Sequence, residues 1–333
     1  LTSPEFTITR NGINFLVGGG NHPGETCVNL VVGGNVVRTA TGDDSDVMRW
    51  AGWNVAEFKG QQARIQIVDN FGGFWGRIYV DHIHFSDVLV DHRREHAKWV
   101  ELSPDFFAPK FVRDYDGTET DVKWLGWIGS WRYEASRPVP ANWGKGAESI
   151  FRKLQLVPSA RGYELVQEPV VEMQSLRGPA VTALPRRLTG TAPFAEFQPA
   201  TNTYEIEAVF ALAESAAIFG LNLCVGGSQR VVVGFDAATS NLYLDRRSSG
   251  YVSLDPAFPR IVNVPYRPPG DKLKLRIFVD QCSIEVFADD GRQVLTSQIY
   301  PDPSGTGIEL FSFGAPTTLT SLRAWPLASI WPP

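Results

Sequence analysis

Alternation of hydrophobic and polar residues dominates the second half of the chain. The stretch KLKLRIFVD, residues 272–280, places an apolar residue at every second position from Leu273 to Val279. The stretches YEIEAVFAL (204–212) and QRVVVGFD (229–236) show the same alternation. A period of two is typical of a β-strand with one buried face, and we find no long stretch with the 3.6-residue period of an amphipathic helix. The pattern predicts an all-β protein.

Shorter apolar runs fill the first 90 residues. Each run is closed by glycine, aspartate or asparagine, residues that favour turns over strands. The runs are INFLVGG, CVNLVVGG, VVRTA, ARIQIVD and RIYVDHIHFSD. We expect residues 1–90 to form a small β-sandwich module.

Two further segments differ in character from this module. Residues 91–185 begin with the charged joint DHRREHAK and continue through an aromatic stretch at 124–134. Residues 186–333 begin with a linker rich in proline and glycine, and turn signals then recur every 8–12 residues, which is typical of a two-sheet sandwich. A chain of 333 residues is long enough for two or three domains.

Charge and cysteine content exclude several classes of function. Lys and Arg number 31 against 36 Asp and Glu, a net charge of −5, so no nucleic-acid partner is expected. No apolar run approaches the ~20 residues of a membrane helix, so no membrane partner is expected. Cys27, Cys224 and Cys282 are widely spaced and suit small core positions; one disulfide pair stays open.

The stretch WLGWIGSWRYE, residues 124–134, concentrates three tryptophans and a tyrosine. These rings suit either a core strand or the floor of a sugar site, because a flat indole shields the C–H face of a sugar from water. Trp131 is the preferred candidate for sugar contact. Trp124 and Trp127 fit a packing role better, and Trp127 is kept as a second candidate contact.

Several motifs in order resemble glycoside hydrolase family 32, the invertases, inulinases and levanases. GWIGSWRY (126–133) is similar to a strand near the end of that family's propeller, and ELSPDFFAPKF (101–111) to the segment before it. LYLDRRSSG and LKLRIFVDQCSIEVFADDGRQVLT are similar to its C-terminal sandwich. The resemblance covers about residues 99–333. It implies that residues 91–185 are a remnant of a five-bladed β-propeller, about one blade, and that residues 186–333 are the C-terminal two-sheet β-sandwich.

The resemblance implies a retaining hydrolysis at the fructose anomeric carbon. That chemistry requires two carboxylates roughly 5–5.5 Å apart and neither cofactor nor metal. The family carries them in motifs that precede the DFYA-like segment, and Asn-Asp-Pro-Asn-Gly occurs nowhere in the 333 residues. Asp114 in VRDYDG and Glu172 in VVEMQS follow that segment and lack the flanking residues, so they are interpreted as loop or strand-edge charges. Catalytic residues are therefore not assigned.

Candidate sugar contacts can still be named from the resemblance. Trp131 occupies the position of the tryptophan that lines the family's fructose subsite, and Tyr133 of the same strand is a further candidate contact. Asp105 and Glu101 stand at acidic positions of the DFYA-like segment, where they suit either hydroxyl acceptance or surface charge. A role for these two as the catalytic pair is disfavoured.

His82 and His84 in the first module form a His-x-His pattern that can ligate zinc. No third ligand follows at a recognisable spacing, so we interpret the pattern as a polar strand face and expect no metal. The module itself resembles a small sandwich that accompanies some family 32 proteins. Whether it binds sugar is left open.

The sequence is compatible with three functions. The first is a fructan-associated part that cannot hydrolyse sugar alone. The second is an active β-fructofuranosidase, levanase or inulinase completed by a complementary chain or by self-association, and the third is a carbohydrate-binding accessory protein. All three have a fructose-containing oligo- or polysaccharide as partner, and the family's polymeric substrates imply secretion.

Overall fold

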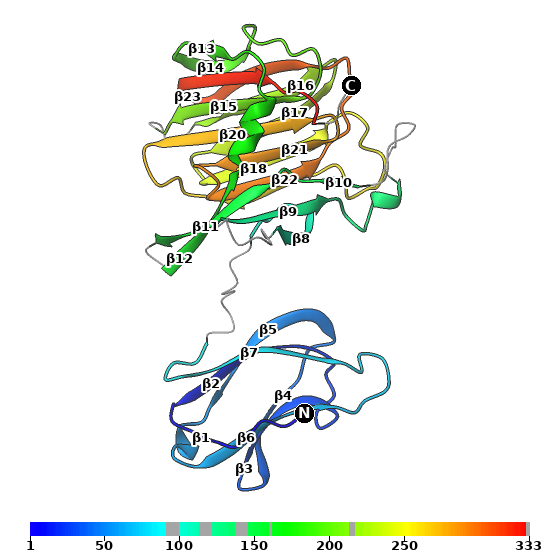
Figure 1. Ribbon diagram of the computed structural model, residues 1–333, viewed down its shortest axis with the longest axis vertical. Helices are drawn as coiled ribbons and strands as arrows, with labels where there is room; N and C mark the ends of the chain where they lie inside the picture. The colour runs from blue at the N-terminus through cyan, green and yellow to red at the C-terminus, as the bar shows by residue number, and fades with distance from the viewer. Residues whose placement is uncertain (91–99, 113–120, 137–145, 160–161, 213–216, 331–333) are drawn as a thin grey trace. The chain divides into compact units, whose positions relative to one another are not determined.

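The computed structural model describes residues 1–333 except 91–99, 113–120, 137–145, 160–161, 213–216 and 331–333. The chain forms two compact units, Leu1–Lys98 (unit 1) and Trp99–Pro333 (unit 2) (Figure 1). Strands dominate both units, and the helical elements of the described residues are three short 3-10 turns, η1 Ala56–Phe58, η2 Glu134–Ser136 and η3 Val171–Leu176. The all-β prediction is confirmed. The charged joint at 91–98 lies outside the described residues.

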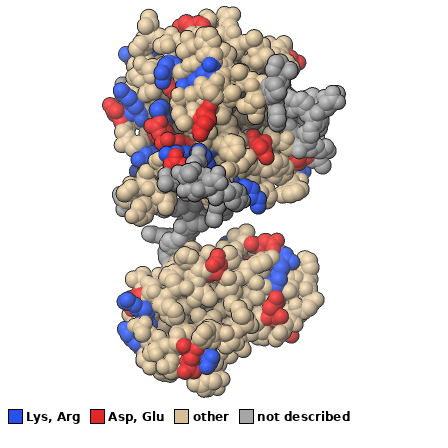
Figure 2. Space-filling model, in the orientation of Figure 1, with Lys and Arg blue, Asp and Glu red and all other residues tan. Residues whose placement is uncertain are grey.

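Unit 1 is a sandwich of two antiparallel sheets. One sheet runs β1 (Phe6–Thr7), β6 (Gln62–Asp69), β3 (Thr26–Val32) and β4 (Asn35–Ala40). The other runs β5 (Ser45–Asn54), β2 (Gly12–Gly19) and β7 (Ile78–Ser86). Phe15, Leu30 and Trp53 are buried between the sheets, so alternate positions of each strand form the core. Charged side chains lie in small separate groups on the visible face of this unit (Figure 2).

The first part of unit 2 is a sheet with the arrangement of a single propeller blade. Its strands are β8 (Phe106–Val112), β9 (Val122–Ile128), β11 (Arg152–Ser159) and β12 (Gly162–Pro169), each antiparallel to the next, with short β10 (Ala147–Glu148) beside the end of β9. Trp124 on β9 is buried, as the packing interpretation predicts.

The rest of unit 2 folds around one long strand, β23 (Gly307–Pro326). Its first half pairs with β16 (Ile218–Gly226) and its second half with β15 (Tyr204–Ala211), and β14 (Arg186–Pro193) runs along both halves. From β16 (Ile218–Gly226) the sheet continues to β17 (Gln229–Asp236), β18 (Asn241–Ser248) and β19 (Ile261–Pro265). From β15 (Tyr204–Ala211) it continues to β20 (Lys272–Asp280), β21 (Ser283–Ala288) and β22 (Gln293–Gln298), while β13 (Val181–Ala183) and β14 (Arg186–Pro193) line β23.

Glycines bend the two strands that pass from one layer to the other. Gly314 in β23 has φ 75° and Gly190 in β14 has φ 67°, a left-handed conformation that costs glycine no steric penalty. The β14–β23 register shifts between Leu188 and Gly190. The continuous sheet therefore folds over into two layers, with a large apolar core between them that includes Phe210, Leu221 and Leu275.

Candidate functional site

Three aromatic rings gather on the surface of the blade. Phe107 and Trp127 are directly opposite each other on β8 and β9, so their side chains share one face of the sheet. Trp131 lies in the turn after β9, with its ring centroid 5.3 Å from that of Trp127 and 6.4 Å from that of Phe107. Trp131 is 79% exposed and Phe107 46%. We call these three residues the aromatic platform.

Two glycines hold the central ring of the platform. A Cβ atom on Gly129 would stand 2.5 Å from the Trp127 indole, and one on Gly146 would stand 2.6 Å from its Nε1. Both distances are too short for any side chain, so backbone on two sides fixes this indole. Of the glycines between the tryptophans, Gly129 thus lets backbone pack against Trp127, whereas a Cβ atom on Gly126 would meet the Phe106 ring instead.

Asp105 lies in the interior of unit 2, where its carboxylate is fully engaged. Arg246 on β18 donates to it from Nη1, and the Gln298 backbone N–H donates over 2.8 Å. Arg246 also donates from Nε to the Phe258 carbonyl over 2.7 Å, and its guanidinium lies 4.0 Å from the centre of the Phe258 ring. Both members of the ion pair are completely buried, so Asp105 joins the blade to the sandwich.

Tyr133 belongs to the same buried group. Its hydroxyl donates to Asp105 and accepts a hydrogen bond from Arg246 Nη2 over 2.9 Å. Burial, followed by the neighbouring Asp105 charge, raises the pKa of Tyr133 well above its usual range. The phenol therefore acts as a neutral donor that completes the ion pair.

Glu101 takes part in a second buried ion-pair network. Arg152 on β11 donates from Nη1 to Glu101 over 2.8 Å and from Nη2 to Glu285 on β21 over 2.7 Å. Arg152 Nη2 also donates to Thr296 Oγ1 over 2.6 Å, and its guanidinium lies 4.1 Å from the centre of the Phe106 ring. An isolated buried charge is unfavourable, so this pairing of one arginine with two carboxylates holds the blade on the sandwich.

The five residues predicted to contact sugar therefore separate into two groups. Trp131 and Trp127 belong to the exposed aromatic platform, whereas Tyr133, Asp105 and Glu101 point into the ion-pair networks. Sugar contact remains a prediction, and the geometry directs it to the two tryptophans.

Sequence reasoning missed the two buried arginines. The signal for Arg246 was present in LYLDRRSSG, because a charged residue at a core-facing position of a strand requires a buried partner. Arg152 gave no such signal, since its partners Glu101 and Glu285 are 51 and 133 residues away in the sequence.

Two further acidic residues, Glu172 and Asp280, have partners of their own. Glu172 is exposed on η3, with a carboxylate oxygen 3.5 Å from Lys123 Nζ, and Asp280 accepts a hydrogen bond from the Thr203 hydroxyl over 3.2 Å. Asp114 lies outside the described residues. Glu285 on β21 is buried against Arg152.

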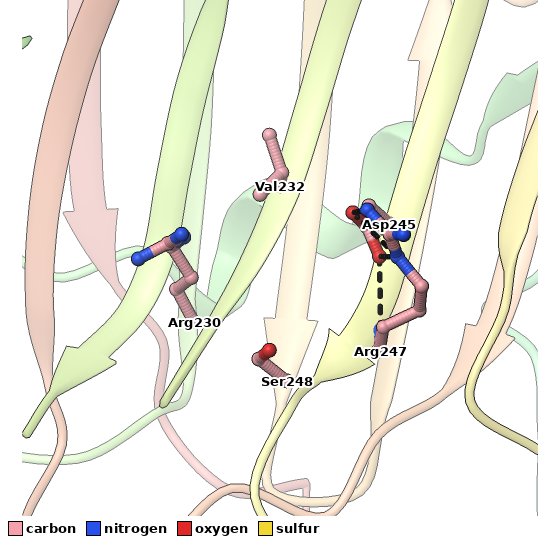
Figure 3. A pocket seen from close by; sticks show the side chains of 5 residues that line it. All are labelled: Arg230, Val232, Asp245, Arg247 and Ser248. Carbon is pink, nitrogen blue, oxygen red and sulfur yellow. Dashed lines mark hydrogen bonds and ion pairs between the residues drawn. The ribbon is translucent and has the colours of Figure 1, made fainter. Parts of the chain in front are cut away.

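A pocket of about 280 Å³ lies on the sandwich between β17 and β18 (Figure 3). Arg247 is held there by Asp245, with Nη2 2.7 Å and Nε 3.0 Å from the carboxylate oxygens. Arg230 stands across the pocket on the neighbouring strand, with Val232 and Ser248 between the two. The pocket offers hydrogen-bond donors, while its one carboxylate is already paired.

In unit 1, His82 and His84 lie side by side as the alternation predicts, with ring centroids 5.4 Å apart, and both contact Trp50. Across the described residues, no group of three His, Cys, Asp or Glu side chains is placed to hold a metal ion. Cys27 and Cys224 are buried thiols in different units, and burial raises the pKa of Cys224 to about 12. Within the described part of the chain, no helix has the length and apolarity needed to cross a membrane.

Two sequence models of one enzyme family match adjoining parts of the chain. The model described as the glycosyl hydrolases family 32 N-terminal domain matches residues 53–169. The model described as the glycosyl hydrolases family 32 C terminal matches residues 172–326. The matched residues include the aromatic platform and both buried arginines.

Curated relatives and solved structures agree with these matches. The chain is 33% identical to the Aspergillus rugulosus protein named as a glycosyl hydrolase, ecdE, over 99% of this chain and 47% of the relative. It is 35% identical to a levanase of Bacillus subtilis over 70% of this chain and 34% of the levanase. The chain thus spans half or less of the length of these relatives.

Among solved structures, the exo-inulinase of Aspergillus awamori superimposes with a TM-score of 0.63 at 24% identity, covering 92% of this chain and 57% of the inulinase. A β-fructofuranosidase of Schwanniomyces occidentalis, complexed with fructosyl-erythritol, superimposes with a TM-score of 0.59 at 20% identity, covering 86% of this chain and 58% of that enzyme. At these identities the superpositions show a shared fold.

Proposed function

Because the chain belongs to glycosyl hydrolase family 32, we propose that it forms a fructose-contacting part of a β-fructofuranosidase-type protein and does not hydrolyse fructans by itself. The observation that carries this proposal is the aromatic platform. Its exposed indole, Trp131, offers a flat apolar face of the kind that excludes water from one side of a sugar ring. Relatives named as levanase and exo-inulinase support fructans as the sugar.

The chemistry of the site supports the second half of the proposal. Retaining hydrolysis needs one carboxylate free to attack the anomeric carbon and a second to protonate the leaving oxygen. Asp105, Glu101 and Glu285 are held by buried arginines, so none of them can approach a sugar without breaking an ion pair. In this proposal the catalytic pair comes from propeller blades outside these 333 residues.

The surface of the blade supports a role for such further blades. Leu156 on β11 is 68% exposed and Phe111 on β8 is 60% exposed. Strand pairing places both side chains on the face that carries the buried Arg152 and Trp124, at positions of that face that the sandwich leaves exposed. Exposed apolar groups on an open sheet favour association with another apolar surface. We propose that complementary blades pack here, either from the same polypeptide or from a second chain.

The first experiment measures fructose released from sucrose, inulin and levan by the purified chain, together with its retardation in gels that contain levan or inulin. We expect no release, and Trp131→Ala should weaken the gel retardation about fivefold through the lost ring contact. Phe313→Ala is the matched control, because Phe313 is an exposed aromatic residue on the sandwich of the same unit.

Each alternative gives a distinct result. Fructose release by the single chain would contradict the proposal and would direct attention to Asp105, Glu101 and Asp114. Release that begins only after a chain carrying the early blades is added would establish the completed enzyme. Fructan binding unchanged by Trp131→Ala would favour an accessory protein that binds sugar elsewhere. Secretion belongs to the same proposal, since two relatives of this chain are named as extracellular exo-inulinases.

A further inference from the structure

Three loops meet at one end of unit 1 and are joined through their backbones. Residues 19–22, 41–46 and 71–77 form this loop tip. Gly20 N–H donates to the Arg77 carbonyl over 2.8 Å, and Gly42 N–H donates to the Gly20 carbonyl over 3.1 Å. Asn21 N–H donates to the Asp44 carboxylate over 2.8 Å. The three loops are therefore held together through backbone hydrogen bonds.

Glycines bring these loops closer than any side chain allows. A Cβ atom on Gly20 would stand 2.0 Å from the Trp75 carbonyl oxygen, and one on Gly42 would stand 2.2 Å from the Gly19 carbonyl oxygen. These contacts are with backbone, which cannot swing aside as a flexible side chain does. The tip is consequently a rigid piece of surface.

Two residues of the tip adopt a backbone conformation that L-amino acids avoid. Trp75 has φ 60° and Asp44 has φ 57°. For a bulky aromatic residue the left-handed region is strained, and such strain collects at sites that hold ligands.

The rigid tip presents aromatic and charged groups to solvent. Phe74 is 87% exposed, with its ring 5.8 Å from that of Trp75. Arg77 lies 4.4 Å over the Trp75 ring and donates to Asp46 over 2.9 Å, and the Tyr79 hydroxyl donates to the same carboxylate oxygen. One strongly exposed apolar ring therefore stands beside fixed donors and acceptors, a combination that suits a polyhydroxylated ligand.

We propose that the loop tip binds fructan chains, with Phe74 against the C–H face of a fructose unit and Asp46 and Arg77 toward its hydroxyls. The identity of the sugar rests on the proposed function, whereas the site rests on the geometry of unit 1 alone. Exposed aromatic residues also enter lipid surfaces, but Asp43, Asp44 and Asp46 would bring three carboxylates against an anionic membrane.

The test is affinity electrophoresis of the full chain in gels that contain levan or inulin, with dextran as a sugar control. Phe74→Ala should raise the dissociation constant for levan or inulin about fivefold, because the loss of one aromatic ring contact typically weakens binding by about this factor. The variant should keep its unfolding midpoint, because the Phe74 ring makes little contact with the rest of the chain. Val36→Ala, an exposed apolar residue on β4, is the matched control and should bind like the wild type.

The outcomes separate this site from the aromatic platform on the blade. A loss with Phe74→Ala that persists in a Trp131→Ala background supports the loop tip even if the platform binds no sugar. Equal binding by Phe74→Ala and the wild type would overturn the inference. The inference would also be overturned if only dextran gels retarded the protein. It would likewise be overturned if the protein bound no fructan and sedimented with phosphatidylglycerol vesicles.

Discussion

Adjacent arginines on β18 have opposite surroundings. Arg246 is completely buried and paired with Asp105, whereas Arg247 projects to the surface pocket and pairs with Asp245 two residues before it. The register of β17 and β18 shifts between Arg230 and Val232, so a β-bulge lies at this point of the strand pair. A bulge changes the direction of side chains locally. Here it lies where the buried Arg246 and the exposed Arg247 point to different surroundings.

Substituting these two arginines should give very different results. Arg246→Met leaves the Asp105 carboxylate buried without its cation, and we expect the free energy of unfolding to fall by about 3–5 kcal/mol. Arg247→Met removes an exposed pair and should leave stability unchanged within error. Urea unfolding of both variants, followed by tryptophan fluorescence, makes the comparison. Similar losses in the two would refute the structural role of the buried pair.

Asp46 at the loop tip gives a pH prediction. The hydrogen bond from Arg77, followed by that from Tyr79, lowers the pKa of Asp46 below its ordinary value of 3.8. The folded state therefore holds the carboxylate ionised at a pH where the unfolded state protonates it. This contribution to stability is complete above pH 3.8 and disappears as the pH falls through the lower, folded-state value.

The wild type should therefore lose stability below pH 3.8 more steeply than Asp46→Asn, which has no charge to lose at this position. Thermal unfolding at a series of acidic pH values measures the difference. Parallel curves for the two proteins would show that the Arg77 contact does not act in solution.

At the scale of single elements, the fold-over of the large sheet depends on Gly314. Alanine there would have to keep φ 75°, a left-handed conformation that costs an L-residue about 1–2 kcal/mol. We expect Gly314→Ala to lower the free energy of unfolding by that amount. Gly270→Ala is the control, since nothing lies within 4 Å of its added Cβ and its φ is not in the left-handed range. A loss of stability in the control as large as that at Gly314 would contradict the explanation.

Strands were the part of the structure most readily predicted from the sequence. The stretch 272–280 is β20 from end to end, and its alternate residues from Leu273 to Val279 are buried as expected. Phe278 lies on the opposite face, which alternation expects to be polar, yet it is buried there against Phe287 and Met173. Alternation within one strand carries no information about a distant segment that covers its outer face.

The candidate site was predicted less completely for a related reason. Trp131 was the preferred candidate contact and Trp127, for which a packing role was favoured, the second candidate; both lie on the aromatic platform. Asp105 and Glu101 were recognised as acidic positions, but their arginine partners are far away in the sequence and local patterning cannot identify them. Patterns of residues close together in the sequence cannot predict ion pairs between residues that only the tertiary fold brings together.

At the scale of the whole molecule, the two units have separate apolar cores. One core surrounds Phe15 and Leu30 in unit 1, and the largest core of unit 2 lies between the two layers of its sandwich. The two proposed sugar-contacting surfaces belong to different units, the loop tip to unit 1 and the aromatic platform to unit 2. Substitutions in one core should therefore leave the chemical groups of the other surface in place.

β23 also has a consequence for how the protein is made. This strand comes after all four of its partners, β13, β14, β15 and β16, in the chain. A ribosome releases residues in order at roughly 5–20 per second, so those four strands emerge before the one segment that joins them. A nascent chain stalled before Gly307 would display two unfinished sheets with open edges, which chaperones and proteases recognise. Translation through β23 is thus required before the two sheets can join.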